Sequence, residues 1–134
     1  MKIIPTKVHA IFDYLNGIAL IAVPYLISDT RGIEMTIPMV LGVIVLLQSL
    51  ITNYELSVAD ILPVQAHLGL DATAGGFLAI SPFLFGFEDI VLWPHLLIGL
   101  GEIAGAILTE KYRRDRPLDD QTHVQGGRTA TLST

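Results

Sequence analysis

An internal repeat constrains the fold of this chain more than any other feature of its sequence. A shift of 58 residues places the stretch 3–26 on the stretch 61–84. Five identities then coincide: Pro5 with Pro63, His9 with His67, Asp13 with Asp71, Gly17 with Gly75, and Pro24 with Pro82. A shift of 57 residues further pairs Gly42 with Gly99 and Thr52 with Thr109. The fold must therefore contain one supersecondary unit twice, because a repeat of this length is such a unit stacked on its copy.

The composition indicates that lipid is the solvent of this unit. Hydrophobic residues make up 51% of the chain and charged residues only 16%, whereas soluble domains are about 25% charged. The mean hydropathy is +0.59. Charges are absent over 14–28, 35–54 and 72–87, which are fifteen, twenty and sixteen residues long. Because a helix needs about 20 residues to cross a bilayer, two of the spans must include a polar residue or two near one end.

We therefore predict an all-α membrane protein with four transmembrane helices, over 7–27, 37–53, 64–85 and 91–109. Each repeat is a helical hairpin, with repeat one at about 3–54 and repeat two at about 61–110, so residues 1–110 form one transmembrane domain. Two spans per repeat give both repeats the same direction, and a pseudo-two-fold axis along the membrane normal then relates them. Residues 111–134 lack apolar periodicity, which predicts a disordered cytoplasmic tail.

The distribution of basic residues predicts how the domain is oriented. Six Lys and Arg residues flank the two ends of the domain: Lys2, Lys7, Lys111, Arg113, Arg114 and Arg116. The first and third connections together carry only Arg31. Since Lys and Arg accumulate on the cytoplasmic side, we expect a multi-pass protein of the cytoplasmic (inner) membrane with both termini cytoplasmic. His9 and Asp13 interrupt the first apolar stretch, which argues against a cleaved signal peptide.

Several sequence elements carry a resemblance to a known family. The elements are PTKVHAIFDYLNG, TNYEL, VQAHLGLDATAGG, SPFLFGF and WPHLLIGLGEI. They resemble the SPW-repeat family of small bacterial and archaeal membrane proteins over about residues 3–110. The family has a Ser-Pro-Trp triplet in each unit, and here Phe83 and Tyr25 replace its tryptophan. The resemblance implies a four-helix membrane fold and no established activity.

Five ionisable residues fall inside the predicted spans: His9, Asp13, His67, Asp71 and Glu102. Such groups cost about 2.5–3.5 kcal/mol near the bilayer centre, so they face protein or water. The i, i+4 spacing places each His on the same helix face as its Asp. At a rise of 1.5 Å per residue, Asp13 and Asp71 lie about 9 Å and Glu102 about 12 Å from the cytoplasmic helix ends. We predict one polar layer of two imidazoles and up to three carboxylates, in which Glu102 is the asymmetric member.

Three roles for this polar layer stay open at the level of sequence. It can fix helix register through buried hydrogen bonds. It can bind a divalent metal ion, or haem through the two histidines. It can also relay protons or ions. Our leading hypothesis is a structural or accessory membrane component without a cofactor, and a metal- or haem-binding subunit or a small ion carrier is the alternative.

The sequence also bears on catalysis and on partners. There is no cysteine, no nucleophile–base pair and no phosphate-binding glycine loop, so catalysis by this chain alone is not expected. The expected partners are the lipid bilayer and either a second copy of the chain or a larger membrane complex. The basic residues after residue 109 are interpreted as an orientation anchor, and no nucleic-acid partner is expected.

Small residues and prolines predict how the helices pack. Four glycines are predicted to allow close helix contact, within the bundle or between protomers: Gly17, Gly75, Gly101 and Gly105. Pro24 and Pro82 each remove a backbone hydrogen bond and are predicted to kink their helices. Asn16 and Gln48 are expected to form interhelical hydrogen bonds, and His95 is expected at the outer membrane surface.

Overall fold

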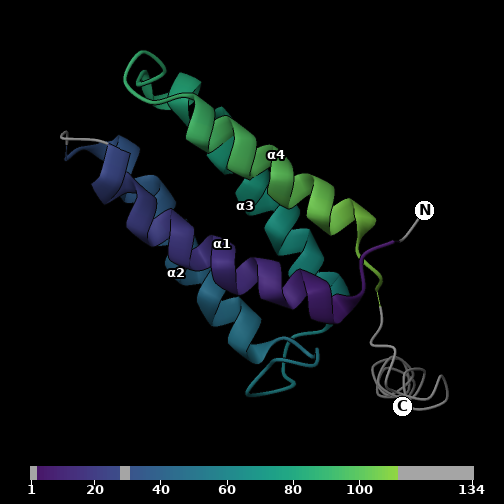
Figure 1. Ribbon diagram of the computed structural model, residues 1–134. Helices are drawn as coiled ribbons and strands as arrows, with labels where there is room; N and C mark the ends of the chain where they lie inside the picture. The colour runs from purple at the N-terminus through teal and green to yellow at the C-terminus, as the bar shows by residue number, and fades with distance from the viewer. Residues whose placement is uncertain (1–2, 28–30, 112–134) are drawn as a thin grey trace, which may run out of the picture.

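The computed structural model describes residues 3–27 and 31–111 of the 134. Four helices follow one another: α1 (Thr6–Ile27), α2 (Ile33–Ile51), α3 (Val64–Phe85) and α4 (Trp93–Leu108). The predicted all-α fold of four helices is thus confirmed (Figure 1). The helix boundaries differ from the predicted spans by a few residues, mainly because α2 begins at Ile33. The predicted tail, from residue 112 onward, lies outside the described residues.

Prolines and one glycine mark several of the helix ends. Pro5 and Pro63 come directly before or near the first residue of α1 and α3, and Pro94 lies in the first turn of α4. Proline suits these positions because the first turn of a helix needs no backbone donor. Gly86 ends α3 in the left-handed conformation, with φ 70°, and its N–H donates to the carbonyl of Pro82. Only glycine adopts this conformation at no steric cost.

The helix composition is that of a multi-pass membrane protein. α1, α2 and α3 are each long and apolar enough to cross a bilayer, and α4 is a shorter apolar helix of 16 residues. Large apolar side chains cover the outside of the bundle, and Leu26, for example, is 80% exposed. Apolar surface of this extent is stable in lipid and not in water.

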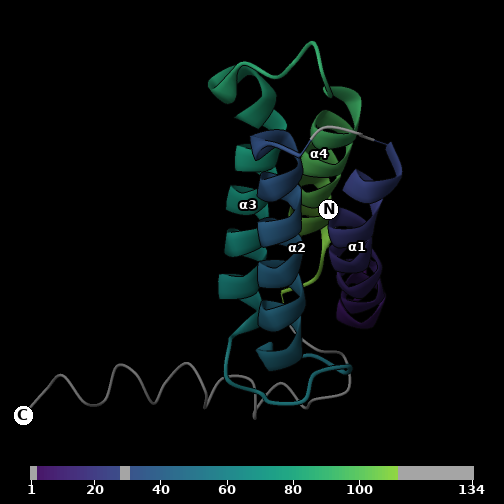
Figure 2. The same ribbon diagram turned by 90° about the vertical axis from the view of Figure 1, so that its left-hand side faces the viewer.

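The helices are arranged as two hairpins, α1 with α2 and α3 with α4, and α2 packs against α3. Figures 1 and 2 show the hairpins side by side, with the start of α1, the end of α4 and the α2–α3 connection at one end of the bundle. We call this end the terminal end. The connections within the two hairpins lie at the opposite end (Figure 1).

Each hairpin is closed by a pair of glycines that occupy equivalent positions in the two repeats. A Cβ atom on Gly42 would lie 2.7 Å from the carbonyl oxygen of Gly17, and one on Gly75 would lie 2.6 Å from that of Gly99. Gly17 and Gly75 therefore bring together the two helices of their own hairpin. Gly101 has no neighbour within 4 Å among the described residues, and Gly105 lies only loosely against the His9 ring.

The terminal end is also closed by two equivalent backbone bridges. Thr52, which follows α2, forms a parallel bridge with Leu62, which precedes α3. Thr109, which follows α4, forms the same bridge with Ile4, which precedes α1. The end of each hairpin is thereby joined to the start of the other.

Candidate functional site

Two histidines and two aspartates meet between the two hairpins, near the terminal end. They are His9 and Asp13 of α1 and His67 and Asp71 of α3, and we call them the His–Asp quartet. All four side chains are at most 4% exposed. The Nε2 atom of His67 lies 2.9 Å from Asp13 Oδ2 and 3.0 Å from Asp71 Oδ2. The Nε2 atom of His9 lies 3.1 Å from Asp71 Oδ2 and 3.5 Å from Asp13 Oδ1.

Each histidine thus contacts the aspartate of the other repeat as well as its own. The shortest contact of His9 is with Asp71, and the shortest contact of His67 is with Asp13. The two imidazole rings meet edge to face, with their centroids 5.7 Å apart. The quartet is therefore a junction between repeats, and neither His–Asp pair is confined to a single helix.

A threonine at the end of a helix holds the outer nitrogen of each histidine. Thr52 Oγ1 lies 2.8 Å from His67 Nδ1, and Thr109 Oγ1 lies 3.0 Å from His9 Nδ1. Each threonine hydroxyl also donates, at 2.6 Å, to the carbonyl four residues earlier. A hydroxyl has only one hydrogen, so each threonine oxygen accepts from the Nδ1–H of its histidine. Both Nε2 atoms are thereby turned towards the aspartates.

The groups that reach the aspartates from outside the quartet are hydrogen-bond donors. Tyr54 donates its hydroxyl to Asp13 Oδ2 at 2.8 Å, Ser49 approaches the same oxygen at 3.4 Å, and Gln48 donates to Asp71 Oδ1. Burial and the neighbouring Asp13 raise the pKa of Tyr54, so its hydroxyl stays protonated. This pattern is satisfied by two ionised carboxylates and two doubly protonated imidazoles, whose charges cancel.

The support around the aspartates departs from the symmetry of the repeat. Gln48, Ser49 and Tyr54 all belong to repeat one. At the shift of 57 residues, Gly105 and Ala106 stand in repeat two where Gln48 and Ser49 stand in repeat one. Repeat one therefore supplies the outer hydrogen bonds of both aspartates, and only the threonine contacts are duplicated.

Glu102 belongs to a separate contact between α1 and α4. The Asn16 amide donates to Glu102 Oε1, and the carboxylate side chain is buried. The four donor atoms that converge come from the quartet without Glu102. The predicted polar layer thus consists of the quartet with Glu102 and Asn16 beside it, and Asn16 and Gln48 both bond between helices.

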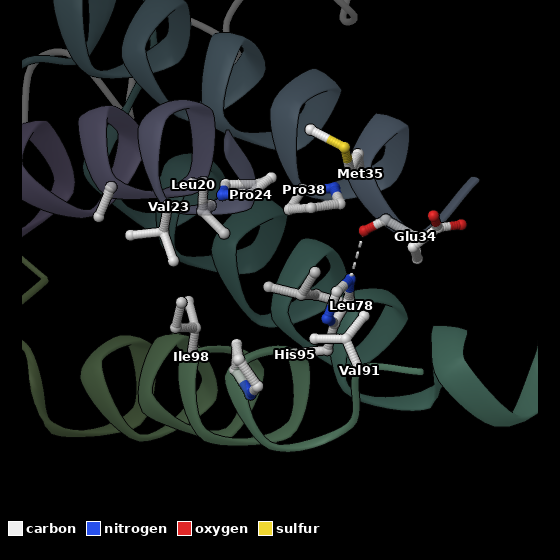
Figure 3. A pocket seen from close by; sticks show the side chains of 12 residues that line it. Leu20, Val23, Pro24, Glu34, Met35, Pro38, Leu78, Val91, His95 and Ile98 are labelled. Carbon is white, nitrogen blue, oxygen red and sulfur yellow. Dashed lines mark hydrogen bonds between the residues drawn. The ribbon is translucent and has the colours of Figure 1, made fainter. Parts of the chain in front are cut away.

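A cavity lies at the opposite end of the bundle, between the two hairpins (Figure 3). It has about 380 Å³ between its walls, part of it open to the outside, and its lining is mainly apolar. Pro24 of α1 and His95 of α4 are among the lining residues. His95 was expected at the surface, but it is buried against Phe87, and its Nε2 donates to the Glu34 carbonyl at 3.1 Å. The expectation failed because the α3–α4 connection folds Phe87 over it.

Sequence reasoning did not assign the residues that support the quartet: Ser49, Thr52, Tyr54 and Thr109. A signal was present for the two threonines, since they coincide when the repeats are superimposed. Tyr54 follows α2 in the connection between repeats, and no spacing relates it to Asp13. Its position depends on the hydrogen bonds that return this connection to the bundle, such as that of Asn53 N to Leu62 O at 2.8 Å.

Replacing Thr52 by valine should destabilise the protein. The change keeps the side-chain shape but leaves His67 Nδ1 without its acceptor, and an unsatisfied buried donor costs about 1–3 kcal/mol. Thr73→Val is the matched control, because Thr73 makes the same bond to the carbonyl four residues earlier, at 2.8 Å, on an exposed face of α3. Unfolding in detergent by a denaturant series measures both variants. Equal losses in the two variants would contradict the role assigned to Thr52.

A comparison with protein families identifies the chain's relatives. The SPW repeat domain matches residues 7–109, a range that contains all four members of the quartet and both supporting threonines. No curated protein and no solved structure matches the chain. Phe83 and Tyr25, at the positions of the family's tryptophan, are each 59% exposed, so both lie on the outer face of the bundle, away from the quartet. The chain therefore belongs to the SPW repeat family of membrane proteins.

Proposed function

We propose that this protein is a structural or accessory component of the cytoplasmic membrane, in which four transmembrane helices form two parallel hairpins. A pseudo-two-fold axis along the membrane normal relates the hairpins. The observation that carries the proposal is the His–Asp quartet, to which each repeat contributes one histidine and one aspartate. Its partners are the bilayer and a second copy of the chain or a larger membrane complex.

The contacts of the quartet support a locking role. Its atoms are already paired with one another and with Thr52, Thr109, Tyr54 and Gln48. Hydrogen bonds between membrane helices contribute about 0.6–2 kcal/mol each, and several of them acting together fix how the two hairpins are rotated. α4 has 16 residues, or about 24 Å at 1.5 Å per residue, so it crosses the bilayer with its polar flanking residues close to the interface.

Proton flux into liposomes distinguishes this role from that of a relay. Purified protein reconstituted with a pH-sensitive dye inside the vesicles is expected to leave the flux at the level of protein-free vesicles. A flux above that level that disappears in Asp71→Asn would overturn the structural role and establish a relay. Circular dichroism of the variant shows whether the loss reflects unfolding.

The orientation makes a separate prediction. The end of the bundle that carries Lys7 and Lys111 is expected in the cytoplasm, because basic residues are retained on that side. A green fluorescent protein at the C-terminus should therefore fluoresce, and an alkaline phosphatase at the same place should be inactive. The phosphatase inserted in the α3–α4 connection, near Glu88, should be active. An active phosphatase at the C-terminus would contradict the orientation.

A further inference from the structure

We propose that the His–Asp quartet is the binding site of a divalent transition metal ion of the zinc class. The ligands are Nε2 of His9 and of His67 and one carboxylate oxygen each of Asp13 and Asp71. The inference rests on the proposed junction between the repeats, because the same four side chains form both. It adds a chemical occupant that the junction alone does not require.

The spacing of the four ligand atoms fits a tetrahedral ion. One ligand atom from each residue can be chosen so that all four lie within 4.8 Å of one another. Zinc binds nitrogen and oxygen ligands at about 2.0–2.2 Å, so the ligand atoms of a tetrahedral site lie about 3.3 Å apart. The four His–Asp contacts of the quartet measure 2.9, 3.0, 3.1 and 3.5 Å. The ligands are therefore close to their positions around an ion.

The surroundings orient these ligands as those of metal sites are oriented. A metal-binding histidine usually donates its other N–H to a fixed acceptor, which holds the ring and selects the nitrogen that binds. Thr109 accepts from Nδ1 of His9, and Thr52 accepts from Nδ1 of His67. The carboxylates are fixed in turn by Tyr54 and Gln48. Both repeats thus present Nε2 to the same point.

The exchange of protons for metal leaves the charge of the site unchanged. Without a metal, the two Nε2–H groups donate to the two carboxylates, so two imidazolium and two carboxylate charges cancel. One divalent ion takes the place of the two Nε2 protons, which leave to the solvent, and the two imidazoles become neutral. Two positive charges again meet two carboxylates. This neutrality matters because an uncompensated charge is costly inside a membrane.

The donor set selects among ions. Two imidazole nitrogens with two carboxylate oxygens suit zinc and its neighbours, whereas calcium requires six to eight oxygen ligands. Four protein ligands complete a tetrahedron, which is the arrangement of structural zinc sites. Haem does not fit, because Asp71 Oδ2 lies within 3.1 Å of both Nε2 atoms, where the haem iron and its ring would have to be.

Metal analysis of the purified full-length protein in detergent tests the proposal. After treatment with a chelator, equilibration with Zn²⁺ and removal of the excess, mass spectrometry is expected to find one zinc per protomer. His67→Gln and Asp71→Asn should reduce it to the background level. His95→Gln is the control, because His95 is equally buried but lies in the cavity wall at the other end. Absence of zinc from the wild-type protein, or its full retention in Asp71→Asn, would overturn the proposal.

Two further measurements do not depend on removing a ligand. Co²⁺ loaded in place of zinc should give the intense visible absorption of a tetrahedral nitrogen–oxygen site, and the weak bands of octahedral Co²⁺ would contradict the proposal. Thr52→Val keeps all four ligands but loses the fixed acceptor of His67, so the affinity for zinc should fall about 10–100-fold. Unchanged affinity in Thr52→Val would contradict the assigned orientation of Nε2.

The outcomes also separate this inference from the proposed structural role. If the wild-type protein binds no zinc but Asp71→Asn is strongly destabilised in chelator, the metal site is refuted and the junction stands. If zinc binds at one per protomer but Asp71→Asn is as stable as the wild type in chelator, the junction without metal is refuted and the metal site stands.

Discussion

Replacing Asp71 by asparagine is expected to lower the free energy of unfolding by about 3–5 kcal/mol, the cost of removing one partner from a buried ion pair. Asp71 accepts from His9, from His67 and from Gln48. Asparagine keeps the size of the side chain but loses its charge and brings an amide N–H₂ group into the site. Two positively charged histidines would then share Asp13 alone, and the uncompensated charge would be buried.

Unfolding of the purified protein in detergent measures this effect, in buffer with a chelator so that a bound metal does not contribute. Asp89→Asn is the matched control, since it makes the same chemical change at an exposed position in the α3–α4 connection. Substitutions at such positions change stability by about 0.5 kcal/mol or less. A loss below about 1 kcal/mol in Asp71→Asn would show that the quartet is not a charged junction.

Gly75→Ala is expected to have the second largest effect. The new Cβ would lie 2.6 Å from the carbonyl oxygen of Gly99 and 2.7 Å from the Cβ of Glu102. The clash is with the backbone of α4 and with the first carbon of a side chain, so α3 and α4 must move apart. Overpacking of this kind costs about 1–3 kcal/mol, and more where the neighbours cannot shift.

The neighbouring residue Gly76 provides the control. A Cβ on Gly76 meets nothing within 4 Å, and alanine in a helix interior is about 1 kcal/mol more favourable than glycine. Gly76→Ala should therefore be neutral or stabilising, whereas Gly75→Ala should be destabilising. Denaturation of both variants in the same detergent gives the comparison. The same sign of change in both would contradict the close contact between α3 and α4.

The helices and their pairing into hairpins could be predicted because they depend on local patterns. Long stretches without charge define a span in any order of packing, and a duplicated pattern of His9, Asp13 and Gly17 on His67, Asp71 and Gly75 defines two equivalent units. A short connection forces its two helices to be neighbours. These inferences use only the chain near each residue.

The cross-pairing of the quartet could not be predicted in the same way. The i, i+4 spacing shows that His9 and Asp13 share a helix face, and it contains no information on how α1 is rotated relative to α3. That rotation depends on the packing of both hairpins, including the close approach of Gly17 to Gly42. A register change of one residue would turn His9 away from Asp71, so the contact is a property of the assembled bundle.

Glu102 illustrates a second limit. Its depth in the span was estimated correctly enough to place it beside the quartet, but depth alone does not select a partner. The structure pairs it with Asn16, which lies three residues beyond Asp13 on α1. The direction in which a side chain leaves α4 decides between the two, and that direction follows from the contact of Gly99 with Gly75.

The two backbone bridges at the terminal end give the repeats a cyclic order. Thr52 pairs with Leu62 at the start of repeat two, and Thr109 pairs with Ile4 at the start of repeat one. Each repeat thus presents the same surface to the other, as the subunits of an isologous homodimer do. A single-hairpin ancestor could form this structure from two identical chains, and gene duplication and fusion would then have linked them. Fusion also freed the copies to differ, which accounts for Gln48 in one repeat and Glu102 in the other.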